Sequence, residues 1–456
     1  MIMLYKYLQS LIFTICLIIP GNIFGTDNGV LELYIKQGLE SNLALEQKRE
    51  NYNLNYEILK ESRGMFLPSM SFNMRYSIAR GGRIIEFPVG DLLNPVYSTL
   101  NLLTERNDFT TIENETFRFY RPREHETKIR IVQPVIHPEI WYNKRIRGHE
   151  KDIGYIDIDI YKRSLVAEIK EAYFNYLKSL QIEQVIENTI ILLKENIRVS
   201  EKLAENDMVT QDYIFRSRAE LSSAEQQIAE AIGSRKVAKA WFNFLLNRDL
   251  EDEIEIDGTI LTDKMTINQN DNLFNTSGRE ELEKASRMVF IAEDYLDLKR
   301  SGRLPSITAI VEYGFQGTTY SFGKDDDFVL ASIVLSWPLF EGFRNNSGIQ
   351  QAKVKKNMME LMHQEVQQKL NLEIINSWYR LEAADKAVDA SISRVKSSRA
   401  AFRIIERMYE EGQATLIEYI DARTDMTNSK INLVISKYDY YISYAVYEKS
   451  AALYRF

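Results

Sequence analysis

The sequence predicts a mainly α-helical protein with a few long β-strands, built from two copies of one structural unit. Three observations predict this class. Two long stretches contain no proline beyond their first turn, three short motifs recur in the same order in both halves, and four segments alternate apolar with polar residues. The chain has 456 residues, but only 20 Gly and 9 Pro, which is too few for a fold rich in turns.

The composition excludes several classes of protein. The net charge is −8 and no long basic run occurs, so nucleic acid is not an expected partner. One Cys and four His exclude a disulfide scaffold and a Cys-rich metal site, and we expect no metal or cofactor. No Ser/His/Asp order and no Gly-rich phosphate loop stands out, so we do not expect an enzyme.

The first 25 residues have the pattern of a secretory signal peptide. Lys6 supplies the positive charge, residues 11–20 form the apolar core, and Gly25 offers a small residue for cleavage. Cleavage would remove Cys16, whose use as a lipidation site is disfavoured by the bulky Ile15 before it. No later apolar run has the length of about 18 residues that a transmembrane helix needs.

The repeated motifs divide the chain. Leu67-Pro68-Ser69 recurs at residues 304–306, and residues 133–136 recur at 337–340, aligned on their prolines. Residues 203–221 align without gaps on residues 408–426. We therefore predict a signal peptide (1–25), a first repeat (26–248), an inter-repeat linker or equatorial segment (249–276) and a second repeat (277–456).

Each repeat is predicted to contain a helix, two strands, a long helix and a closing helix. The predicted first helices are 30–65 and 277–302, the long helices 139–206 and 342–411, and the closing helices 210–247 and 415–454. Both short helices of a repeat can stack end to end along the long one, which predicts long, coiled-coil-like helical hairpins. The first strand pair is interrupted by a loop at residues 79–125.

The strands alternate along their length. Met70, Phe72, Met74 and Tyr76 point to one side, and the residues between them point to the other. Half-buried strands of soluble proteins alternate in the same way. Together with the signal peptide, the pattern favours strands that cross an outer membrane. Four strands are too few to close a barrel, so such a chain must oligomerise.

These features resemble the TolC-like outer-membrane efflux and secretion channels. The resemblance lies in the Leu-Pro-Ser motifs at 67–69 and 304–306, in residues 337–342 (Trp-Pro-Leu-Phe-Glu-Gly), and in residues 412–415 with 418–422. It implies a homotrimer with a 12-stranded β-barrel in the outer membrane of a diderm bacterium and a helical α-barrel in the periplasm. It also implies a passive exit duct of a tripartite efflux or type I secretion system. The expected partners are a periplasmic adaptor, an RND, ABC or MFS inner-membrane transporter, and outer-membrane lipid.

The turns between long and closing helices are candidate docking sites. Thr210 and Thr415 have the position of N-caps, and Asp207 is expected to adopt a left-handed backbone. The resemblance implies that both turns contact the adaptor. Their residues are Asp207, Met208, Val209 and Thr210 in the first turn, and Gly412, Gln413, Ala414 and Thr415 in the second.

A polar stripe follows the second turn. Glu418, Asp421 and Asp425 lie on one helix face, which on an ordinary helix is simply solvated. The resemblance implies that Glu418 and Asp421 form carboxylate rings at a gate, and that Tyr409 matches a tip tyrosine. By the repeat alignment Arg216 lies level with Asp421, so we predict that it contributes to closure. Ala414 stands where the family often has a closing arginine.

Two other functions stay open at this point. A surface coiled coil without a pore would show sustained heptads and no paired alternating strands. A periplasmic adaptor would carry one helical hairpin between β-domains, whereas this sequence predicts two hairpins.

Overall fold

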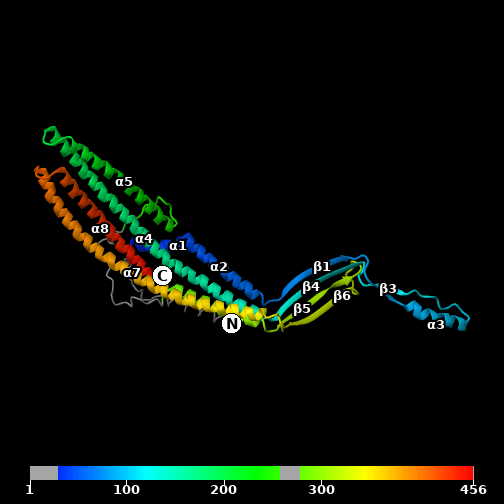
Figure 1. Cartoon of the computed structure of the whole chain (residues 1–456). Coiled ribbons are helices and arrows are strands. Elements are labelled where there is room, and N and C mark those ends of the chain that lie inside the picture. Colours follow the sequence, from blue (N-terminus) through cyan, green and yellow to red (C-terminus); the bar gives the residue numbers. More distant parts are fainter. Residues whose placement is uncertain (1–28, 257–277, 455) are drawn as a thin grey trace, which may run out of the picture. The chain divides into compact units, whose positions relative to one another are not determined.

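The structure is a computed structural model that describes residues 29–256, 278–454 and 456 (Figure 1). The predicted signal peptide, Cys16 and most of the predicted linker lie outside the described residues. The chain divides into two compact units. The helical unit contains the described residues within Met1–Gln47, Ile158–Arg279 and Gln368–Phe456, and the sheet unit contains Lys48–Asp157 and Glu280–Gln367. In the described part of the chain, no helix combines the length and hydropathy needed to cross a membrane.

The elements follow the predicted order, with additions between the first two long strands. The helices are α1 (Val30–Ser41), α2 (Leu43–Gly64), α3 (Val89–Thr104), α4 (Pro138–Glu205), α5 (Asp212–Leu245), α6 (Glu280–Ser301), α7 (Arg344–Glu410) and α8 (Leu416–Ser450). The strands are β1 (Ser69–Ile78), β2 (Ile84–Phe87), β3 (Glu115–Arg118), β4 (Arg123–Ile136), β5 (Ser306–Gly317) and β6 (Asp327–Ser336). The prediction of a mainly helical chain with four long strands is confirmed. The repeat boundaries stay a prediction.

The sheet unit is organised around an antiparallel sheet in the order β1-β4-β5-β6. Its register places Phe72, Ile129, Tyr313 and Val329 in one row across the four strands. These four apolar side chains are 41% to 71% exposed, so this row across the sheet is apolar and uncovered. Within the described residues β1 and β6 are open edges, because each pairs with only one neighbour.

The opposite face of the sheet carries a chain of ion pairs. Lys128 Nζ on β4 lies 2.8 Å from Glu126 and 3.1 Å from Glu312 on β5. Arg75 of β1 lies 3.2 Å from Glu126, and Arg130 lies 3.5 Å from Glu312. A charged face opposite an apolar face is the arrangement expected of a strand between water and lipid.

The segment between β1 and β4 corrects one prediction. Residues 79–125 were expected to form a loop, but they contain the short β2–β3 pair and helix α3. Asn94 exchanges two hydrogen bonds of 2.9 Å with the backbone of Ile112, and Asn101 bonds both backbone groups of Phe109. These amides hold α3, which contains Pro95 in its interior, against the returning chain.

The predicted single helix at 30–65 is also wrong, because it breaks at Asn42. The Asn42 backbone is extended (φ −66°, ψ 122°), so α1 ends there and α2 begins. Its side-chain oxygen accepts a hydrogen bond from Leu45 N at 2.9 Å, which caps α2. Its amide donates to Leu245 O at 2.9 Å, so the break is fixed by packing on α5.

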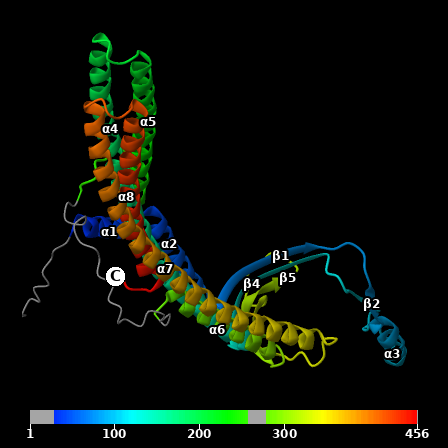
Figure 2. The same cartoon turned by 60° about the vertical axis from the view of Figure 1, so that its left-hand side comes forward.

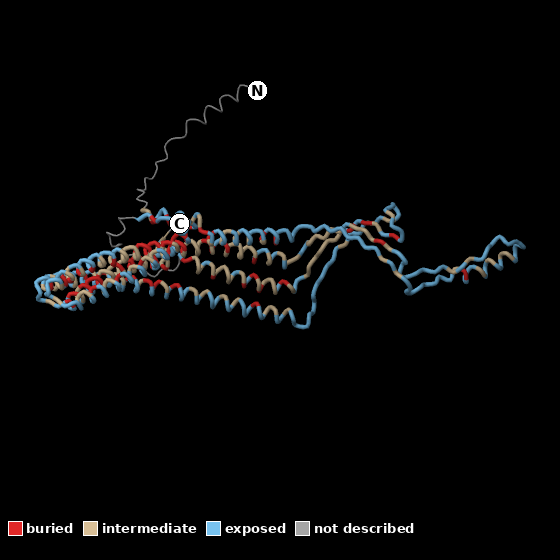
Figure 3. The backbone as a smooth tube through the Cα atoms, turned by 90° about the horizontal axis from the view of Figure 1, so that it is seen from above, coloured by how far each residue is buried: buried red, intermediate tan, exposed pale blue. Residues whose placement is uncertain are grey.

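The helical unit contains two helical hairpins side by side, α4 with α5 and α7 with α8 (Figures 1 and 2). Buried residues gather in this unit, as the red segments of Figure 3 show. The core is aromatic: Phe242 lies 5.0 Å from Tyr34 and 5.7 Å from Tyr173, measured between ring centroids, and Phe174 stacks on Tyr441. This core joins α1, α4, α5 and α8, and so anchors the two hairpins at their bases.

Candidate functional site

The tip of the first hairpin is a tight turn. Asp207 has a φ of 53°, which confirms the expected left-handed backbone. Met208 N donates to Leu203 O at 2.9 Å and closes the end of α4. The prediction that Thr210 caps α5 is wrong, because the N-cap position is Gln211 and has no side-chain cap. The Thr210 hydroxyl instead donates to the carboxylate of Asp212.

The tip of the second hairpin is more strongly built. Gly412 has a φ of 71°, and Thr415 is the N-cap of α8, as predicted. Thr415 and Glu418 form a capping box: Glu418 N donates to the hydroxyl at 3.3 Å, and Thr415 N donates to the carboxylate at 2.8 Å. Hydrogen bonds from the Thr415 backbone and hydroxyl lower the pKa of Glu418, which is therefore ionised.

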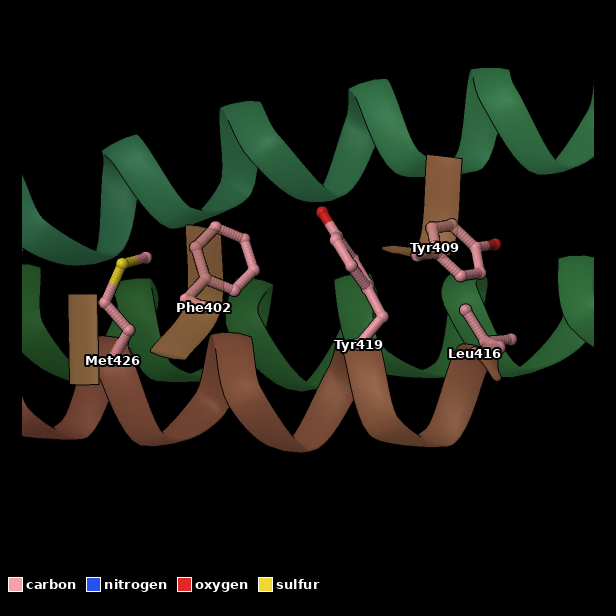
Figure 4. Packing of buried hydrophobic residues seen from close by; sticks show 5 residues of the cluster. All are labelled: Phe402, Tyr409, Leu416, Tyr419 and Met426. Atoms are coloured by element: carbon pink, nitrogen blue, oxygen red, sulfur yellow. The ribbon is translucent and has the colours of Figure 1, made fainter. Parts of the chain in front are cut away.

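Behind this turn lies an aromatic tip cluster, of which only Tyr409 was among the predicted site residues. It consists of Phe402 and Tyr409 on α7 and Leu416, Tyr419 and Met426 on α8 (Figure 4). Tyr409 and Tyr419 stack with their centroids 4.8 Å apart. Tyr213 of α5 packs against the cluster, so it also joins the two hairpins. The spacing of 3 and 7 residues on α8 was the available signal.

Burial changes the chemistry of both tyrosines in the tip cluster. Desolvation raises the pKa of Tyr419 to about 12, and the nearby carboxylate of Glu406 acts in the same direction. Desolvation also raises the pKa of Tyr409, against the opposing effect of the Ser200 hydroxyl. Both phenols are therefore neutral at physiological pH. Tyr409 is 9% exposed, so it lies inside the tip and not on its surface.

The predicted stripe lies at the surface of the second hairpin. Glu418, Asp421 and Asp425 are exposed, and with residues of α7 they line an open groove. Arg216 lies 3.6 Å from Asp212, one turn earlier on its own helix, and both side chains are 56% exposed. The structure thus groups the three carboxylates on one face of α8 and gives Arg216 a local partner on α5.

A buried ion pair links the two hairpins. Arg423 of α8 is 3% exposed, and its Nη2 donates to Glu220 of α5 at 2.7 Å. Its Nε and Nη1 atoms are buried without a hydrogen-bond partner among the described residues. A small polar cavity beside it is lined by both hairpins, including Thr189, Gln227 and Thr427. Arg423 aligns with Arg218 of the predicted first repeat, one of the few identical positions. This identity was the sequence signal for the Glu220–Arg423 ion pair.

Comparisons with known proteins agree with this architecture. The model of a family described as "Outer membrane efflux protein" matches residues 277–447. Outer membrane protein TolC of Escherichia coli K12 is 24% identical over 169 residues, which is 34% of this chain and 34% of that protein. Multidrug resistance outer membrane protein MdtP of E. coli O6:H1 is 21% identical over 283 residues, 60% of this chain and 56% of that protein.

The likeness to solved structures extends further along the chain. The structure of the Campylobacter jejuni CmeC outer membrane channel superposes with a TM-score of 0.73 and 15% sequence identity. The superposition covers 92% of this chain and 85% of that one. The sequence alignments to TolC and MdtP span 34% and 56% of those proteins. The fold, in contrast, is shared over nearly the whole chain.

Proposed function

We propose that this chain is an outer membrane efflux protein and the outer-membrane exit duct of a tripartite efflux or type I secretion system. The observation that carries the proposal is the four-stranded sheet with an exposed apolar row on one face, ion pairs on the other face and two open edges among the described residues. Three copies would supply twelve strands and pair every open edge in one closed barrel. The helical hairpins would then surround a periplasmic conduit that opens at their tips.

The assembly has a direct test. Protein extracted from outer membranes should migrate as a trimer that dissociates on heating, and it should conduct ions in planar bilayers. The physical reason is that four strands cannot close alone, so the chain needs copies of itself to cover its strand edges. A monodisperse monomer without membrane association would contradict the proposal.

The tips are the proposed contact with a periplasmic adaptor. Asp207, Met208, Gly412 and Gln413 are exposed at the ends of the hairpins, and the Met208 side chain is 71% accessible. An exposed methionine beside polar turn residues suits a partner helix with a mixed apolar and polar face. The adaptor in turn would connect the duct to an inner-membrane transporter.

The carboxylates of α8 are the proposed gate. Three copies would bring up to six carboxylates from Glu418 and Asp421 to the narrow end of the conduit, and rings of like charge attract divalent cations. The buried Tyr409 would support this end from within, and Arg216 would balance part of its charge. Asp425 lies farther along the stripe, next to the groove between α7 and α8.

The gate predicts a change in ion block. Replacing Glu418 by Gln and Asp421 by Asn should reduce the block of conductance by divalent cations, because the ring loses its negative charge. Gln keeps the acceptor of the capping box, so the turn should survive. Conductance should be measured in planar bilayers over a series of Mg²⁺ concentrations. A block equal to that of the wild-type protein would place the stripe outside the conduit.

A further inference from the structure

The two hairpins of one chain meet through a defined pair of faces. The first hairpin contributes Tyr213, which packs on the tip cluster, and Glu220, which holds Arg423. Thr189 also reaches Thr427 across the same seam, with 3.4 Å between the hydroxyls. This seam fixes how a first hairpin sits against a second hairpin, and both are copies of one repeat.

The repeat alignment maps this seam onto surfaces that are open in the single chain. The gapless alignment places Tyr213 and Glu220 of the first hairpin at Glu418 and Asp425 of the second. Glu418 and Asp425 line the open groove between α7 and α8, together with Ala401, Ile405 and Ala422. The face of the second hairpin that corresponds to a filled seam is therefore empty.

The reverse mapping marks a corresponding face on the first hairpin. Tyr409, Leu416, Tyr419 and Arg423, which fill the internal seam, correspond to Ala204, Gln211, Ile214 and Arg218. Ala204, Gln211 and Ile214 line an open pocket at the first tip. Arg218 is 60% exposed and contacts only Glu201 of its own hairpin, at 2.9 Å, among the described residues. This face thus carries an accessible arginine.

We propose that the α7–α8 groove of one copy takes the first hairpin of a second copy, and that Arg218 of this second copy pairs with Asp425. The charges favour a second copy as the partner. Within one chain Glu220 of the first hairpin pairs with Arg423 of the second. The aligned residues are Asp425 and Arg218, which keep the acid and the base. A guanidinium and a carboxylate make a strong, directional contact. A head-to-tail contact of this kind forms a ring when the rotation between copies closes, as the proposed trimer requires. The inference rests on the proposed assembly and adds the residues that join its copies.

Cross-linking tests the pair directly. In a background with Cys16 replaced by Ser, the double variant Arg218→Cys with Asp425→Cys is treated with a short bis-maleimide. We expect covalent dimers and trimers on a denaturing gel. The matched control is Glu220→Cys with Arg423→Cys, whose two cysteines would be cross-linked within one chain. It should therefore run as a monomer after the same treatment.

Charge reversal gives a second readout. Arg218→Asp alone and Asp425→Arg alone should each lower the temperature at which the trimer dissociates, and the two together should restore it. Two results together would overturn the inference: no cross-linked dimers or trimers with the Arg218→Cys and Asp425→Cys variant, and no restored dissociation temperature with the double reversal. If the protein is still a conducting trimer, the proposed function would stand. A monomer in every variant and in the wild type would overturn the proposed function itself.

Discussion

Replacing Tyr419 by Ala should release the tip of the second hairpin. The Tyr419 ring is 7% exposed and stacks on Tyr409, so its removal leaves a cavity at the centre of the tip cluster. Truncation of a buried aromatic ring costs about 3–5 kcal/mol. Amide hydrogen exchange of peptides covering residues 402–426 should therefore accelerate by about 100-fold or more. Basal conductance should rise with it.

Two variants control this prediction. Tyr419→Phe keeps the ring and removes the hydroxyl, so exchange should stay close to that of the wild type. Ile214→Ala changes the equivalent residue of the first hairpin, which is only partly buried, so its effect should be much smaller. Equal acceleration in Ile214→Ala and Tyr419→Ala would show that the tip cluster does not hold the closed tip.

The regular elements could be predicted because their patterns are local. Proline-free stretches gave both long helices to within a few residues, and period-two alternation gave the four long strands. Helix α3 was missed because Pro88, Pro95 and Asn94 are individually turn-formers. Its stability comes from amide hydrogen bonds to residues 109 and 112, and such contacts between separated residues leave no period in the sequence.

The candidate site was predicted less completely, for a physical reason. Helical spacing shows which residues share a face, but not what covers that face. Arg218 and Arg423 are aligned with each other in the predicted repeats, yet one is 60% exposed and the other is buried. The difference arises from the neighbouring hairpin, which the sequence of either repeat alone does not contain. Tyr409 was placed at the gate by resemblance, and the structure places it in the core behind the turn.

The pair between Glu220 and Arg423 is expected to be worth more than any other ion pair near the tips. The Arg423 side chain is 4% exposed and the Glu220 side chain 37%, so the guanidinium has lost nearly all its water. Two of its nitrogens already lack partners among the described residues. Replacing the Glu220 carboxylate by a neutral amide would leave the buried charge of Arg423 without an opposite charge. Removing one partner of a buried ion pair destabilises the fold strongly.

Glu220→Gln should therefore lower the free energy of unfolding by about 2 kcal/mol, seen as a thermal midpoint a few degrees lower in circular dichroism of the detergent-solubilised protein. The matched control is Glu201→Gln. It removes the carboxylate from the exposed Arg218, whose side chain is 60% accessible, and should cost about 0–1 kcal/mol. Combining Glu220→Leu with Arg423→Met should recover much of the loss, because apolar side chains of similar volume carry no desolvation penalty. Equal shifts for Glu220→Gln and Glu201→Gln would show that water reaches Arg423 and that the pair does not tie the hairpins together.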